Sequence, residues 1–165
     1  MNNNLTYKKA LPEDVALIAE LAESIWKKHY ITIISLEQIN YMLKKMYSAE
    51  SIIQQMNEMH QYTLVYNSET PIGYISLSTV NSKNYILHKF YIESNEQGKG
   101  IGTKVLATIL KDISNAETIE LTVNRKNYKS INFYLKNGFI IKEVADFDIG
   151  EGYFMNDFIM VKMNK

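Results

Sequence analysis

Three alternate glycines, Gly98, Gly100 and Gly102, form the part of the sequence best suited to chemistry. They follow the apolar residues 86–92 and precede a periodic apolar segment at 105–110, so a strand is expected to lead through them into a helix. The first amides of a helix lack intrahelical acceptors, and glycine lets the backbone approach an anion closely. The pattern therefore predicts a phosphate-binding turn, with a helix start that only needs a tight turn as the alternative. Its spacing matches neither GxGxxG nor GxxxxGK[ST], which excludes the common dinucleotide and P-loop sites.

Residues 97–102 resemble the Gln/Arg-x-x-Gly-x-Gly/Ala signature of the GNAT superfamily of N-acetyltransferases. In that family this loop holds the pyrophosphate of acetyl-CoA. The resemblance continues at 123–139, where Asn127, Tyr134 and then a Gly-Phe pair follow a predicted strand at the family's spacing. Residues 148–160 are similar to the last hairpin of many bacterial members, and the overall look is nearest to bacterial polyamine and small-amine acetyltransferases. The resemblance implies acetyl transfer from acetyl-CoA to an amine.

The resemblance also implies which residues contact the cofactor. The loop amides and Gln97 would hold the pyrophosphate, and the end of the preceding strand would pair through its backbone with the pantetheine arm. The cofactor-binding residues expected in this way are Tyr91, Ile92, Gln97, Gly98, Lys99, Gly100, Ile101, Gly102, Thr103 and Asn127. Some of them have alternatives: Lys99 as a solvated lysine in an exposed turn, and Asn127 as a cap at the start of a helix. Tyr91 and Ile92 also suit a core strand, which is compatible with the cofactor role because only their backbone is used.

Tyr134 is the expected proton donor to the departing CoA thiolate, because the family uses a tyrosine at this position. A phenol with a pKa of about 10 suits a sulfur anion formed in a partly dry cleft. The alternative is a core tyrosine in a chain with 12 Tyr. The position of Tyr134 just before the Gly-Phe pair favours the catalytic role.

The general base is harder to assign. Many relatives carry a glutamate eleven residues before the glutamine of the loop, and here that position is Ile86. His88, two residues on, is the candidate base because its ordinary pKa is near 6.5. A half-buried structural histidine, Glu93 at the strand end and deprotonation relayed by water remain alternatives.

The expected acceptor is a small amine or polyamine. Aromatic residues near the end of the first helix (Trp26, Tyr30) and acidic residues before and within the last turn (Asp146, Asp148, Glu151) would suit a cation. A buried Trp and a solvated acidic turn are the alternative. A peptide or protein N-terminus as acceptor, and a non-catalytic acyl-CoA-binding GNAT domain, remain alternative functions.

Composition limits the class of protein. A chain of 165 residues with 46% hydrophobic residues suits a single N-acetyltransferase domain at 1–165. Equal numbers of basic and acidic residues argue against a nucleic-acid partner. The lack of cysteine and three isolated histidines argue against a metal site. No secretion signal or membrane span is visible, so we expect a cytoplasmic protein, with a homodimer as one possible state.

The elements that must position these residues follow from periodicity and caps. An α+β fold is expected: a GNAT-like mixed, mostly antiparallel sheet of about seven strands with a splayed parallel pair, flanked by helices. Helices are predicted at 12–28, 35–46, 48–56, from the glycine cluster onward, and at 129–136. Ser35 and Ser48 are the expected caps of the second and third helices, and Asn137-Gly138 is the expected left-handed stop of the last. Strands are predicted at 5–10, 62–66, 72–80, 84–92, 118–123, 139–144 and 153–162.

Overall fold

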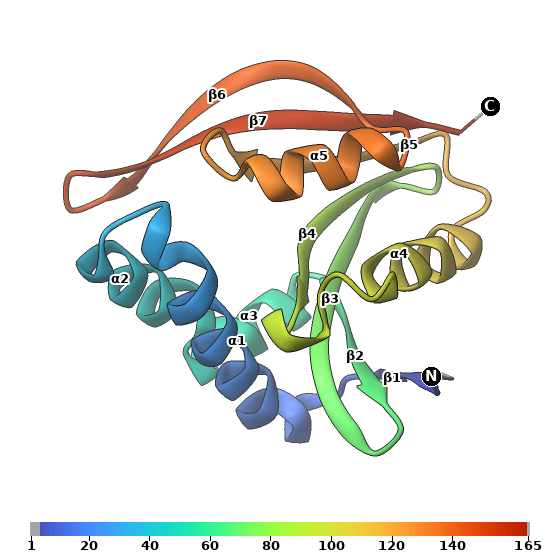
Figure 1. Ribbon diagram of the computed structural model, residues 1–165, viewed down its shortest axis with the longest axis horizontal. Coiled ribbons are helices and arrows are strands. Elements are labelled where there is room, and N and C mark those ends of the chain that lie inside the picture. The colour runs from blue at the N-terminus through green and yellow to red at the C-terminus, as the bar shows by residue number, and fades with distance from the viewer. Residues whose placement is uncertain (1–3, 165) are drawn as a thin grey trace. The chain divides into compact units, whose positions relative to one another are not determined.

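A computed structural model describes residues 4–164 (Figure 1). Residues 1–3, on which the expectation of no secretion signal partly depends, and Lys165 lie outside the described residues. The helices are α1 (Val15–His29), α2 (Leu36–Tyr47), α3 (Ala49–Asn57), α4 (Ile101–Asp112) and α5 (Tyr128–Lys136), with short 3-10 turns at Pro12–Asp14, Tyr30–Thr32 and Ser94–Glu96. The strands are β1 (Leu5–Lys9), β2 (Gln61–Asn67), β3 (Thr70–Asn81), β4 (Asn84–Ile92), β5 (Thr118–Asn124), β6 (Ile140–Gly150) and β7 (Tyr153–Met163).

The strands form one sheet in the order β1-β2-β3-β4-β5-β7-β6. It is mostly antiparallel, with β4 and β5 as the parallel pair, which confirms the predicted α+β class. The β4–β5 register covers Asn84–Ile86 against Thr118–Glu120. The pairing of β5 with β7 continues to Asn124. The predicted splay of β4 and β5 beyond Glu120 stays a prediction.

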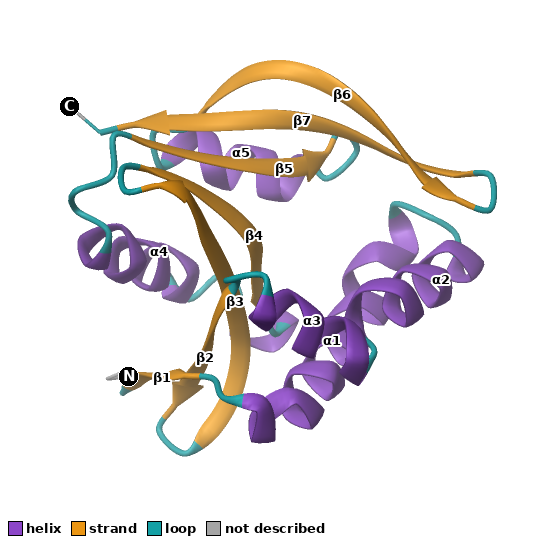
Figure 2. Cartoon of the chain, turned by 180° about the vertical axis from the view of Figure 1, so that it is seen from behind, coloured by secondary structure: helices purple, strands orange, loops and turns teal. Residues whose placement is uncertain are grey.

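The described chain divides into two compact units, and β3 and β4 contribute to both. The first unit contains residues 4–78 and 89–112. In this unit α4 lies on one face of the strands and α1, α2 and α3 lie on the other (Figures 1 and 2). Contacts agree with both faces: Thr108 of α4 bonds Tyr7 of β1 at 3.3 Å, and Lys89 of β4 bonds Gln55 of α3 at 2.7 Å.

Two of the helices in the first unit begin at the caps that the sequence predicts. The side chain of Ser35 accepts a hydrogen bond from the Gln38 amide at 3.1 Å, at the start of α2. The side chain of Ser48 accepts one from the Ser51 amide at 3.2 Å, at the start of α3. These bonds satisfy amides that have no acceptor within the helix.

The second unit contains residues 79–88 and the described part of 113–165, and α5 runs along its strands β5 and β7 (Figure 1). Gly138 ends α5 with φ of +85°, which confirms the predicted left-handed helix stop. The ammonium of Lys162 on β7 donates to the Asn137 carbonyl at 3.0 Å. The face of β7 that bears Lys162 is therefore the face that α5 covers.

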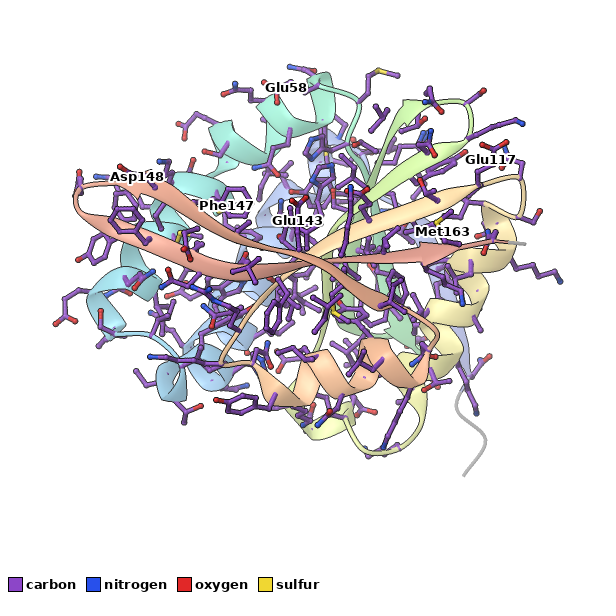
Figure 3. The ribbon with its side chains drawn as sticks, turned by 90° about the horizontal axis from the view of Figure 1, so that it is seen from above. Glu58, Glu117, Glu143, Phe147, Asp148 and Met163 are labelled. Carbon is purple, nitrogen blue, oxygen red and sulfur yellow. The ribbon has the colours of Figure 1, made fainter. Side chains whose placement is uncertain are left out.

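The last hairpin is longer than the sequence predicts, and the predicted end of its first strand was wrong. β6 continues to Gly150 instead of ending at Val144, because its backbone pairs with β7 as far as Gly150 and Tyr153. Asp146 and Asp148 are therefore strand residues rather than turn residues. Figure 3 shows Phe147 and Asp148 towards the turn end of this ribbon.

No helix of residues 4–164 is long and apolar enough to cross a membrane. Within the same residues, no group of three or more His, Asp or Glu side chains is arranged to hold a metal ion.

Candidate active site

The glycine loop adopts a left-handed backbone conformation, which glycine takes up at less cost than other residues. Gly98 and Gly100 have φ of +79° and +75°, whereas a Cβ added at either would meet no atom within 4 Å. Backbone conformation, and not lack of space, therefore accounts for these two glycines. α4 begins directly after them at Ile101, and the Lys104 amide donates to the Gly100 carbonyl at 3.2 Å. The amides of Ile101, Gly102 and Thr103 belong to the first turn, where a helix provides no acceptor.

Gln97 connects this loop to the end of β4. Its side-chain amide donates to the Ile92 carbonyl at 2.8 Å, and its backbone amide donates to the Ser94 carbonyl at 3.3 Å. Gln97 therefore holds the loop against the strand that precedes it. Its direct contact with a pyrophosphate stays a prediction.

Lys99 is half exposed and pairs with Glu96 at 3.4 Å. The carboxylate of Glu96 also accepts from the Asn67 side chain at 3.5 Å. Glu96 is only 15% exposed, but the Lys99 ammonium is accessible to solvent and the separation is long, so the ammonium exchanges partners at little cost. A bound phosphate is therefore able to compete for it.

Gly73 of β3 is a residue that sequence reasoning missed. A Cβ added there would overlap the carbonyl oxygen of Tyr91 and lie 3.1 Å from the Cα of Ile92, the two residues predicted to pair with pantetheine. The Glu93 amide donates to the Ile72 carbonyl at 2.8 Å, which holds β3 and the end of β4 together. No local pattern marks Gly73, because the constraint comes from a neighbouring strand.

Gly73→Ala should lower the free energy of unfolding by about 1–3 kcal/mol, because the added methyl group overpacks two backbones. Denaturant titration measures this change. Val80→Ala on the same strand is the control, since Val80 is exposed and its truncation should leave the midpoint almost unchanged. Equal midpoints for Gly73→Ala and wild type would show that β3 and β4 separate easily at this point.

Trp26 and Tyr30 belong to an aromatic cluster and not to an exposed rim. Trp26 is 2% exposed, stacks on Tyr30 at 4.3 Å between ring centroids, and lies 5.9 Å from the ring of Tyr91. The alternative of a buried first-helix Trp is therefore correct. Lys89, on β4 with Tyr91, has its ammonium 5.3 Å from the centroid of the Tyr47 ring. Burial lowers the pKa of Lys89 to about 8.

Tyr134 lies on α5 in the second unit and is 8% exposed. Its ring contacts Phe133 and Phe139 with centroids 5.3 and 5.5 Å away, so packing fixes the ring. Asn127 caps the same helix, since its side-chain oxygen accepts from the Ser130 amide at 3.2 Å. The cap alternative for Asn127 is therefore correct, and its cofactor contact stays a prediction.

His88 and Ile86 lie on the part of β4 that belongs to the second unit, and both are half-buried. Ile86 pairs with Glu120 of β5 at the end of the parallel register. No carboxylate stands at the Ile86 position, as the sequence shows. The role of His88 as a base stays a prediction.

Asp157 of β7 is a second residue that sequence reasoning missed. It is 5% exposed, it accepts a hydrogen bond from Thr122, and its Oδ1 has no hydrogen-bond partner among the described residues. Desolvation raises the pKa of its carboxyl to about 6 from an ordinary 3.8. A titratable group perturbed by burial is a candidate for a functional role.

The Asp157 carboxyl should make stability fall as the pH rises. Its pKa is higher in the folded than in the unfolded state, so its contribution is fully present below about pH 4 and is lost as the pH passes 6. The difference between about 6 and 3.8 corresponds to roughly 3 kcal/mol. As the pH rises from about 4 to 8, the free energy of unfolding of Asp157→Asn should increase relative to that of wild type by up to this amount. Urea titrations at several pH values measure the difference. A difference that is constant with pH would contradict the raised pKa.

A groove of about 310 Å³ lies between α1 and α2 in the first unit, and it contains none of the predicted site residues. It is lined by Ala19, Glu20, Glu23, Lys27, Asn40, Leu43 and Tyr47.

Comparisons with known proteins define the class. The family model of the acetyltransferase (GNAT) family matches residues 19–139. The chain therefore belongs to the GNAT family and is an acetyl-CoA-dependent N-acetyltransferase.

Known proteins are similar to this chain in sequence and structure over nearly its whole length. A spermidine N(1)-acetyltransferase of Thermoplasma acidophilum is 27% identical, over 96% of this chain and 97% of its own. The crystal structure of the PaiA N-acetyltransferase of Thermoplasma acidophilum in complex with coenzyme A matches with a TM-score of 0.80 at 27% identity, over 97% of this chain and 99% of its own. Ard1 of Thermoplasma volcanium shares the fold, with a TM-score of 0.74 at 17% identity over 96% and 97% of the two chains.

Proposed function

We propose that this enzyme transfers the acetyl group of acetyl-CoA to a primary amine by direct attack in a ternary complex, and that residues 1–165 act as one acetyltransferase domain. The observation that carries the proposal is the left-handed glycine turn at the start of α4, where Gly98 and Gly100 precede three first-turn amides. Such amides and the helix dipole favour an anion. The coenzyme A bound in the PaiA structure supports this reading.

The pyrophosphate would lie over residues 98–103, with Gln97 holding the loop in place and Lys99 adding charge. The backbone of Tyr91 and Ile92 would pair with the pantetheine arm. Tyr134 would donate a proton to the departing thiolate, and His88 is the candidate base from the sequence. Asn127 would contact the cofactor while it caps α5.

We propose a small amine or polyamine as the acceptor. The support is the 27% identity with a spermidine N(1)-acetyltransferase over nearly the full length of both chains. A cytoplasmic location and a homodimer remain expectations from the sequence, and analytical ultracentrifugation would test the homodimer.

The experiment that tests this function measures thiol release from acetyl-CoA across a panel of amines that includes spermidine and peptide N-termini. A thermal-shift titration with acetyl-CoA accompanies it. We expect binding and release with polyamines. Binding without release on any amine would favour a non-catalytic acyl-CoA-binding domain, and release with peptides alone would identify an N-terminal acetyltransferase.

A further inference from the structure

Asp157 lies at a place where a parallel strand ends. It is the cross-strand partner of Asn124, the last residue of β5. In open α/β sheets, ligands bind beyond the carboxyl ends of parallel strands. Here β5 is parallel to β4 as far as Glu120 and continues to Asn124 beside β7. The second unit therefore places the buried Asp157 carboxyl group beside the end of β5, just before the segment that leads to Asn127 and α5.

Asp157 also lies on the face of β7 opposite to α5. Side chains alternate along a strand, and the register with β5 is continuous from Asp157 to Lys162. Lys162 bonds the end of α5, so Asp157, five residues earlier, faces away from that helix. Tyr134 is on α5, and the two side chains thus approach the strands from opposite faces.

The cation that acts on Asp157 is shared with another carboxylate. Arg125, which follows β5, pairs at 2.5 Å with Asp146 of β6. Arg125 attracts the Asp157 carboxylate and Asp146 repels it, while Thr122 of β5 donates a hydrogen bond to it. Within residues 4–164 the buried Oδ1 has no donor at all. A buried carboxylate oxygen without a donor is costly, and an ammonium group would supply both the donor and the charge.

We propose that Asp157 accepts the proton of the acceptor amine, an inference that rests on the proposed function. The ammonium donates to Oδ1 and transfers one proton to it. The neutral nitrogen then attacks the thioester carbonyl, so that a C–N bond forms and the C–S bond breaks. Tyr134 protonates the thiolate and regains a proton from the new amide nitrogen, and Asp157 releases its proton to solvent. One ammonium and one acetyl-CoA thus give one amide, one thiol and one proton.

The geometry suits these two roles. The base must lie beside the nucleophile and the acid beside the leaving sulfur, and these are on different sides of the acyl carbon. Asp157 and Tyr134 approach from opposite faces. Burial keeps the pKa of Asp157 at about 6, closer to neutral pH than an ordinary carboxyl, which makes it a better base while it stays ionised above pH 6.

The test compares two acceptors, spermidine and hydroxylamine, the second of which is already neutral near pH 7. Asp157→Asn should lower kcat/KM for spermidine by roughly 100-fold or more and that for hydroxylamine by less than about fivefold. The acid limb of the wild-type pH–rate profile near pH 6 should disappear. Asp157→Glu, which keeps a carboxylate, should retain that limb, and it serves if the Asn variant does not fold.

Equal losses with both acceptors would make Asp157 a structural residue and overturn the proposal. An unchanged spermidine rate would do the same, as would loss of the acid limb in His88→Ala instead. Wild-type protein that binds acetyl-CoA but acetylates no amine would overturn the proposed function together with this proposal. The other outcomes overturn the role of Asp157 alone.

Discussion

Tyr134→Phe should lower kcat by roughly 10²–10³-fold while the affinity for acetyl-CoA stays near wild type. The hydroxyl is needed when negative charge develops on sulfur, and loss of one such donor typically costs about 2.7–4 kcal/mol of transition-state stabilisation. The ring should stay in place, because Phe133, Phe139 and the rest of its buried environment hold it. Steady-state kinetics and an acetyl-CoA titration separate the two quantities.

Tyr128→Phe is the matched control, because Tyr128 is on the same helix and is 70% exposed. Tyr128→Phe removes an exposed hydroxyl from α5, whereas Tyr134→Phe removes a buried one. We therefore expect Tyr128→Phe to show wild-type kinetics. Turnover of Tyr134→Phe at the wild-type rate would make Tyr134 a core residue and contradict its role as an acid.

Gly100→Asp should weaken CoA binding at least tenfold. A carboxylate about 4 Å from a phosphate charge costs between about 1 kcal/mol in water and about 4 kcal/mol near a protein surface. The left-handed φ of +75° adds backbone strain for any side chain. This strain must be separated from the effect of the charge. Isothermal titration with CoA measures the loss.

Two further variants separate the effect of the carboxylate charge from the effects of backbone strain and of position in the chain. Gly100→Asn has a similar shape without the charge and tolerates left-handed backbone, so it should bind CoA more tightly than Gly100→Asp. Gly152→Asp introduces the same side chain at φ of +79°, again with no atom within 4 Å of its Cβ, but in the β6–β7 turn. It should leave CoA affinity unchanged. Normal affinity of folded Gly100→Asp would place the phosphate site elsewhere.

Local signals in the sequence predicted most of the fold. Ser35 and Ser48 cap α2 and α3 as expected, because a cap depends on residues only three positions apart. The mixed sheet and its parallel pair, β4 and β5, followed from the order of elements and the family resemblance. The full strand order comes from the structure. The end of β6 was wrong because Asp146 and Asp148 look like turn residues, whereas pairing with β7 keeps them in a strand.

The candidate site was predictable where it is local in sequence. The glycine spacing and the family resemblance together predicted the loop of Gly98 and Gly100, and the resemblance predicted Tyr134. Both functional roles stay predictions. Gly73 and Asp157 were not predictable, since each owes its importance to a neighbouring strand far away in the chain. Burial around Asp157, which raises the pKa of its carboxyl, likewise exists only in the folded protein.

The most direct measurement is mass spectrometry of the products formed from acetyl-CoA labelled in its acetyl group and spermidine. Wild-type protein should produce spermidine that carries the labelled acetyl group, in amounts equal to the free CoA released. Tyr134→Phe should produce it far more slowly at the same acetyl-CoA occupancy. Folded wild-type protein that is saturated with acetyl-CoA, yet yields no acetylated spermidine or other amine, would contradict acetyl transfer as the function of this site.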